Sequence, residues 1–456
     1  MSTMRILTPA AALLALACIF DTQAAGFDCK AAASASERAI CADAGLRQLD
    51  ARLADAYAKV LAASTDASAD LRQEQRNWLN ERDGCVADTR CLTTQYEQRI
   101  AALGMPDQAD MEALEALRQA VEAARRTDPE FPLEKALASL KFNAGKTTFY
   151  SEEAPDDPSA PARFPRKRPQ GVSDAEWRAL LASRIESGGE NGRANYMLLD
   201  LDGDGQRDLV IDAYTGGTGL FNSISALRQS GGRFSVPGAR PGAAKQEFDD
   251  EPEGSHLYAI GGRGGNQAAE WVRLRGRVYA VYRDSQYGVD QVSLLRPWRG
   301  NGRVPRLTIR YRYRLSVPAV QAIGERPASR LAPALHRALN EAVAQAAILA
   351  DKTPAQPAQP ICPVAADAPE DVRDDSFSYG PGHYTIETVA DVPVWIGKQC
   401  YLGQLRDWFG GYDAKEGLGA QLCMRKPGVP EPSEDECYAV QGPRTVVRMD
   451  AGVGLY

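Results

Sequence analysis

Several features that would assign a function at once are missing from this sequence. After its first segment it has no apolar run approaching about 18 residues, so we expect no transmembrane segment. It has only three histidines, His256, His336 and His383, and no HExxH, GxSxG or Walker-type phosphate motif. We therefore expect a protein that is not an enzyme. A hydrolase with paired carboxylates remains an alternative, because such pairs leave no fixed spacing in a sequence.

An excess of positive charge is also missing. The 53 lysines and arginines are outnumbered by 60 aspartates and glutamates, which gives a formal net charge of -7. Nucleic-acid-binding domains carry basic patches that pair with phosphates. The balance excludes a generally basic protein of this kind, and we expect no nucleic-acid partner.

The amino end has the layout of a secretory signal peptide over residues 1–25. Arg5 is followed by the apolar run Leu13 to Phe20 and then by small residues. We therefore expect a periplasmic or secreted protein. Cys18 ends the stretch ALAC, which is similar to a bacterial lipobox, so a lipid anchor at Cys18 is an alternative to simple cleavage.

The other eight cysteines fall into two groups of four, and neither group contains the CxxC pairs typical of structural zinc sites. In an oxidising compartment such groups predict disulfides within two separate modules. Each group permits several pairings, and we predict that neighbours pair. The cysteines are Cys29, Cys41, Cys85 and Cys91, followed by Cys362, Cys400, Cys423 and Cys437.

Composition and proline-rich stretches predict an α+β multidomain protein. The expected parts are the signal peptide at 1–25, a small disulfide-linked helical domain at 26–104, a helical extension at 105–150, a proline-rich linker at 151–171, a central mostly antiparallel β domain with flanking helices at 172–350, a Pro/Ala/Gln linker at 351–361, and a small cysteine-containing β module at 362–456.

The first domain shows apolar residues at steps of three and four, which predicts three helices around one seam. The apolar residues are Leu46, Leu49, Leu53, Tyr57 and Val60, then Leu71, Trp78 and Leu79, then Leu92, Tyr96, Ile100 and Leu103. Ser34 and Glu37 form a capping box ahead of this region. A further helix from Met111 to Arg126 is expected to be polar.

The central region changes to the period of two that is typical of strands. From Leu307 to Leu315, apolar residues alternate with polar ones, which predicts a half-buried strand. Residues 271–282 predict a hairpin that turns about Gly276. Ser173 with Glu176 forms another capping box, and residues 331–349 predict a long apolar helix.

Two groups of side chains are candidates for binding. Arg310, Arg312 and Arg314 would place positive charges about 7 Å apart on one strand face, where they could bind an anionic polymer. A solvated face, or protection of an edge strand, is the alternative. Trp408, Phe409 and Tyr412 could form an aromatic platform for glycans or a protein, or they could pack against the disulfides.

The stretch DLDGDGQRD at 200–208 is the strongest chemical signal. It places carboxylates at loop positions 1, 3, 5 and 9 and a glycine at 6, which is the spacing that Ca²⁺ requires. Apolar residues on both sides predict a strand–loop–strand setting. The stretch resembles the calcium loop of FG-GAP and VCBS repeats, in a single copy. We expect a structural Ca²⁺ with the ligands Asp200, Asp202, Asp204, Gln206 and Asp208. Gln206 would bind the ion through its backbone carbonyl.

The first domain also contains a characteristic frame of residues around its cysteines. The frame includes Glu37-Arg38-Ala39-Ile40-Cys41, Gln75-Arg76, Trp78-Leu79, Arg82-Asp83-Gly84-Cys85 and Cys91-Leu92. From about Phe27 to Leu103 it resembles the amino-terminal domain family of the lysozyme inhibitor LprI. The resemblance implies an exported helical domain that binds a protein partner, with lysozyme as the expected target.

These observations together predict an exported cell-envelope binding protein that acts by protein–protein recognition, as a lysozyme inhibitor. One alternative is a calcium-stabilised envelope scaffold that binds peptidoglycan or another anionic polymer. A cell-wall glycan hydrolase is the third hypothesis.

Overall fold

The computed structural model describes residues 29–63, 68–104, 106–153, 160–185, 190–217, 219–237, 254–261, 266–298, 303–323, 326–350, 359–380, 386–407, 412–413, 417–429 and 436–455. The predicted signal peptide and Cys18 lie outside these residues. The chain forms two compact units, one that ends at Gly104 and one that comprises residues 105–456 with the short segment 63–67. Each unit is described by itself.

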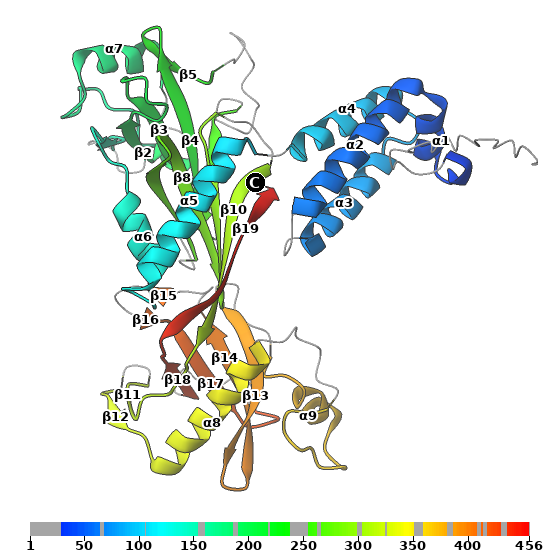
Figure 1. Cartoon of the computed structure of the whole chain (residues 1–456). Coiled ribbons are helices and arrows are strands. Elements are labelled where there is room, and N and C mark those ends of the chain that lie inside the picture. Colours follow the sequence, from blue (N-terminus) through cyan, green and yellow to red (C-terminus); the bar gives the residue numbers. More distant parts are fainter. Residues whose placement is uncertain are drawn as a thin grey trace, which may run out of the picture. The chain divides into compact units, whose positions relative to one another are not determined.

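The first unit is helical (Figure 1). Its described elements are η1 (Cys29–Ala31), α1 (Ala35–Ala42), α2 (Ala44–Ala63), α3 (Ser68–Asp83) and α4 (Thr89–Ala102). The predicted capping box is present at the start of α1, where the Ser34 hydroxyl accepts from the Glu37 amide and the Glu37 carboxylate accepts from the Ser34 amide. The sequence indicated three helices, and the structure adds the short α1 as a fourth.

The apolar positions predicted from the helical period form the core of this unit. Leu46, Leu53, Leu92 and Tyr96 are almost fully buried, and the Trp78 ring meets the Tyr96 ring edge-on at 5.3 Å. Disulfides join Cys29 to Cys41 and Cys85 to Cys91, so neighbouring cysteines pair as predicted. A core this small gains stability from such bridges.

The second unit contains two antiparallel sheets that pack face to face, with helices on their outer faces. The six-stranded sheet has the order β1-β2-β3-β4-β5, and β6 also pairs with β4. Its strands are β1 (Thr147–Tyr150), β2 (Ala194–Leu199), β3 (Asp208–Gly216), β4 (Phe221–Ser230), β5 (Arg233–Ser235) and β6 (His256–Gly261). Helix α7 (Asp174–Ala182) starts at the predicted capping box of Ser173 and covers one face through Ala179 and Leu180. The short η2 (Glu190–Gly192) precedes β2.

The five-stranded sheet has the order β19-β10-β9-β8-β7. Its strands are β7 (Gln267–Leu274), β8 (Arg277–Gln286), β9 (Val289–Leu295), β10 (Arg303–Tyr313) and β19 (Arg444–Leu455). The predicted hairpin is present between β7 and β8. Its two turn residues, Arg275 and Gly276, both have positive φ, as a two-residue hairpin turn of this type requires.

Two helices cover the outer face of this sheet (Figure 1). They are α5 (Gln108–Arg125) and α6 (Pro132–Leu140). The expectation of a polar helix over 111–126 is wrong, because Leu114, Leu117 and Val121 of α5 are completely buried against the sheet. The inner face of the sheet packs against the six-stranded sheet through residues such as Ala280 and Val210.

The remaining elements form a smaller β region with one long helix. Its strands are β13 (Glu387–Ile396), β14 (Gln399–Asp407), β17 (Ala420–Arg425) and β18 (Cys437–Val440), with the short pairs β11 (Val320–Gln321) with β12 (Ser329–Arg330) and β15 (Tyr412–Asp413) with β16 (Gly417–Leu418). Its helices are α8 (Pro333–Ala350), which packs on β13, and α9 (Glu370–Asp375). Cys362–Cys400 and Cys423–Cys437 are the disulfides of this region, again between neighbours.

The last strand, β19, belongs to the five-stranded sheet and not to the four-stranded sheet of the cysteine-containing region. β19 pairs with β10 over its whole length, from Arg303 opposite Leu455 to Tyr313 opposite Arg444. One apolar cluster joins α5, α6 and the five-stranded sheet to α8 and the four-stranded sheet. The stretch 351–361, expected as a linker, lies outside the described residues except for 359–361. Part of the stretch 151–171, also expected as a linker, packs in the core, where the Phe164 ring stacks on Trp177 at 5.9 Å.

Candidate functional site

Two hydrogen-bonded pairs, Arg82 with Asp83 and Tyr96 with Asp50, connect polar side chains in the helical unit. Arg82 is buried, donates two hydrogen bonds to Asp83 at 3.0 and 2.6 Å, and lies over the Trp78 ring at 5.7 Å. The Tyr96 hydroxyl donates to Asp50 at 2.8 Å. Burial is the main reason that the pKa of both Asp50 and Tyr96 is raised. These groups stabilise the packing of the helices.

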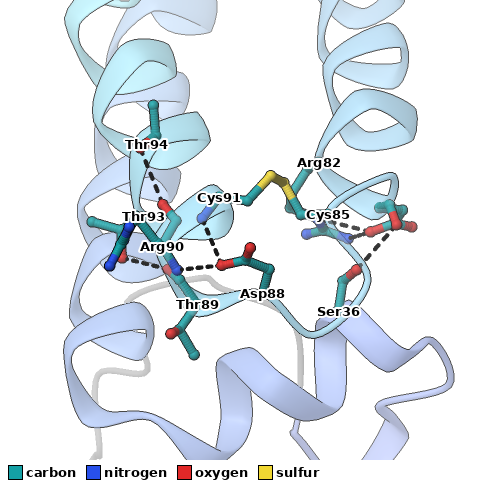
Figure 2. Close-up of a disulfide and its surroundings, with 10 residues drawn as sticks. Ser36, Arg82, Cys85, Asp88, Thr89, Arg90, Cys91, Thr93 and Thr94 are labelled. Carbon is teal, nitrogen blue, oxygen red and sulfur yellow. Dashed lines mark hydrogen bonds and ion pairs between the residues drawn. A yellow bond between two sulfur atoms is a disulfide. The ribbon is translucent and has the colours of Figure 1, made fainter.

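The exposed part of the frame is the short loop between α3 and α4, which the Cys85–Cys91 disulfide closes (Figure 2). Asp88 accepts hydrogen bonds from the amides of Arg90 and Cys91 at 2.9 and 3.1 Å and so starts α4. The Ser36 hydroxyl of α1 donates to the Asp83 carbonyl at 3.3 Å. The backbone of the loop is therefore fixed on both sides.

Val86 is the apolar residue that this loop presents to solvent. Its side chain is 57% exposed, and its φ of 54° is rare for a β-branched residue. Exposed valines are common, but a rigid loop that holds one in a strained conformation resembles a preorganised contact surface. Sequence reasoning missed Val86, because nothing in its local pattern distinguishes it from a core valine.

The acidic loop at 200–208 joins β2 to β3, in the strand–loop–strand setting that was predicted. Carboxylate oxygens of Asp200, Asp202 and Asp208 lie within 4.8 Å of one another. Gly203 and Gly205 have φ of 81° and 87°, which lets the loop turn tightly. The structure thus brings together three of the five predicted ligands.

Asp204 and Gln206 do not join this group. Asp204 accepts from the Gln206 amide at 2.8 Å and faces Arg228 of β4. Arg228 also pairs with Asp202 at 2.6 Å. This arginine was not predicted, because a cross-strand partner 24 positions after Asp204 leaves no local signal in the sequence.

Asp208 is the most unusual carboxylate of the loop, because it is completely buried. Its two oxygens accept from the amides of Leu201 and Gln229, each at 2.9 Å. Burial, with a contribution from the charges of Asp202 and Asp204, outweighs these bonds and raises the pKa of the Asp208 carboxyl to about 7. Arg228 pairs with two of the four carboxylates of the loop, those of Asp202 and Asp204.

The arginine strand is present as expected. Leu307, Ile309 and Tyr311 of β10 are buried, whereas Arg312 and Arg314 on the opposite side are exposed and Arg310 is partly exposed. β10 lies between β9 and β19, so the explanation by edge-strand protection is wrong. Binding of an anionic polymer by these arginines stays a prediction.

The aromatic candidates lie almost entirely beyond what the structure describes. Trp408 and Phe409 are outside the described residues, and Tyr412 is placed only as part of the backbone of β15. Among the described residues, no helix has both the length and the apolar character needed to cross a bilayer.

Comparison with known families supports the interpretation of the helical unit. Residues 29–103 match the family model described as "Lysozyme inhibitor LprI". The amino-terminal unit therefore contains the segment that matches this family and is called the LprI domain below. The match covers less than a fifth of the chain. No curated protein and no solved structure matches the chain.

Proposed function

We propose that this protein is exported to the cell envelope or beyond and that its LprI domain inhibits lysozyme by protein–protein recognition. The match of residues 29–103 to the lysozyme-inhibitor family is the observation on which the proposal rests. The role is one of binding and not of catalysis. The two disulfides of the domain fit an oxidising compartment.

The geometry of the domain supports a specific contact. The Arg82 side chain is buried and hydrogen-bonded to Asp83, so it is not accessible to a partner. The inhibitory surface is therefore composed of exposed residues. The loop closed by Cys85–Cys91 offers an apolar centre at Val86 with the exposed charges of Asp88 and Arg90 beside it. An apolar centre with a polar rim is the usual anatomy of a protein interface, and a rigid loop loses little entropy on binding.

Replacing Val86 by aspartate is expected to weaken lysozyme binding at least tenfold. A buried, unpaired charge at the interface costs more than about 1.4 kcal/mol, which corresponds to a factor of ten. Aspartate tolerates positive φ better than valine does, so the folded domain should be unaffected. Isothermal titration calorimetry of the full chain with lysozyme measures the change.

Val447→Asp provides the matched control, because Val447 is 51% exposed in the second unit. Equal affinities of the Val86→Asp variant and the parent protein for lysozyme would show that the loop is not part of the interface. Absence of binding by the parent protein would refute the proposed function itself.

We also propose that the loop at 200–208 binds a structural Ca²⁺. Asp200, Asp202 and Asp208 would hold the ion, and their hard oxygens suit it. The convergence of three carboxylates, one of them on the completely buried Asp208, is the observation that favours a cation at this place. The ion would supply positive charge that stabilises the connection between β2 and β3.

Ca²⁺ is therefore expected to raise the melting temperature of the parent protein, and Asp200→Ala should abolish that increase. A ligand that binds only the native state at about 100 times its Kd adds about 2.7 kcal/mol to the free energy of unfolding. Differential scanning calorimetry in millimolar CaCl₂ and in EDTA gives the comparison. Asp367→Ala, an exposed carboxylate in the same unit, is the control. Identical melting of the parent protein in both solutions would contradict the site.

A further inference from the structure

A groove with a volume of about 440 Å³ lies on one face of the six-stranded sheet. Helix α7 covers the opposite face of this sheet, and β7 of the five-stranded sheet contributes to the wall of the groove. Its size is within the range of small-molecule sites, about 300–1,000 Å³. It shares no residue with the acidic loop or with the LprI domain. None of its residues belongs to the functions proposed above.

One row of side chains crosses the open end of this groove. Tyr150 of β1 is opposite Asn195 of β2, and Asn195 is opposite Asp212 of β3. Asn195 donates to one oxygen of Asp212 at 3.1 Å, and Asn222 of β4 donates to the other at 2.6 Å. A carboxylate has about four acceptor positions, so two remain for a ligand. The row is a rigid set of donors and acceptors.

The inner end of the groove is apolar. Met197 and Val210 lie opposite each other in the next row of the same sheet face. Ile224 of β4, opposite Asp212, and Trp271 of β7 line the groove as well. Tyr150, 65% exposed, is at the open end. A ligand in the groove would contact aromatic residues from four strands, β1, β2, β6 and β7, and the hydrogen-bonding row of the six-stranded sheet.

The charges on the groove favour an uncharged ligand. Among the described lining residues, Asp212 carries the one negative charge and Lys146 the one positive charge. Sugar rings combine apolar C–H faces, which pack on aromatic rings, with hydroxyls that donate to carboxylates and amides. Glycoside hydrolysis usually requires two carboxylates, and the described lining residues supply one. We propose that this groove binds an uncharged oligosaccharide and does not cleave it.

Isothermal titration calorimetry of the full chain tests the proposal with three probes: chitotriose, cellotriose and maltotriose. At least one of them should give saturable binding with one site per chain. Tyr150→Ala should raise its Kd about tenfold through loss of an aromatic contact. Asp212→Asn should raise it by about tenfold or more, since a hydrogen bond to a charged acceptor is lost.

Both substitutions spare the fold. Tyr150 is largely exposed, and an asparagine at 212 can accept from one of its two asparagine neighbours and donate to the other once that neighbour's amide turns over. Trp395→Ala removes a 44% exposed aromatic residue from β13 and should leave the Kd unchanged. The proposal is overturned if no probe binds, if Tyr150→Ala and Asp212→Asn bind as the parent does, or if tetramethylammonium binds in place of the sugars.

Discussion

Replacing Arg444 by methionine is expected to lower the free energy of unfolding of the second unit by about 3–5 kcal/mol, because the change leaves the buried Asp290 without its cationic partner and Glu134 with Arg283 alone. Arg444 of β19 is 2% exposed. Its guanidinium donates to Glu134 of α6 at 2.5 Å and to the Glu130 carbonyl at 2.8 Å. It is also 3.8 Å from Asp290 of β9 and 4.3 Å from the Tyr311 ring centre.

The expected loss of stability is large because Arg444 connects several elements of the fold. Helix α6 and strands β9, β10 and β19 all contribute to one buried network, in which the Tyr311 hydroxyl donates to Asp290 at 2.7 Å. Burial raises the pKa of Tyr311 well above its ordinary value, and the neighbouring Asp290 charge adds to this, so the phenol remains a donor. Methionine fills similar space but carries no charge.

Chemical denaturation monitored by circular dichroism measures the loss, and Arg448→Met is the matched control. Arg448 is on the same strand, is 55% exposed and pairs with Asp450 at 2.8 Å, so its replacement should cost less than about 1 kcal/mol. Adding Asp290→Asn to Arg444→Met should recover part of the loss, because it removes one uncompensated charge. Equal effects of the two arginine variants would refute the role of the network.

Trp78→Ala is expected to unfold the LprI domain. Deleting a buried tryptophan costs about 3–5 kcal/mol, and a small domain has only about 5–15 kcal/mol of stability in total. Trp78 is 6% exposed, packs edge-on against Tyr96 and lies beneath the Arg82 guanidinium. Its removal leaves a cavity and deletes the cation–π contact with the buried Arg82 guanidinium.

Calorimetry should show the transition of the LprI domain lost or shifted far down, with the transition of the second unit unchanged. Asn77→Ala, at the exposed neighbouring position of α3, should leave both transitions in place. A Trp78→Ala protein with the parent transition would show that the tryptophan is not the centre of the core.

Local patterns in the sequence predicted local structure well. The capping boxes at Ser34 and Ser173, the turn at Gly276 and the disulfides Cys29–Cys41, Cys85–Cys91 and Cys423–Cys437 depend on residues close in the chain. The burial of α5 could also have been predicted, because Leu114, Leu117 and Val121 repeat at steps of three and four. The charged residues between them led to the wrong expectation of a polar helix.

Long-range pairing could not be predicted in the same way. The pairing of β19 with β10 joins residues more than 100 positions apart, and no short-range period encodes a partner. For the same reason the ion pair of Arg228 with Asp202 and the row of Tyr150, Asn195 and Asp212 became visible only in the folded sheet. The spacing of the acidic loop predicted four converging carboxylates, and those of Asp200, Asp202 and Asp208 lie within 4.8 Å of one another, whereas Asp204 is not in this group.

The most direct test of the central claim is a titration of lysozyme activity, measured as clearing of a bacterial cell-wall suspension, with the purified full chain. The proposed role of the LprI domain predicts that activity falls in proportion to added protein and is abolished near one equivalent, whereas the Val86→Asp protein requires a large excess. Full lysozyme activity in the presence of a tenfold excess of the correctly disulfide-bonded parent protein would contradict the account.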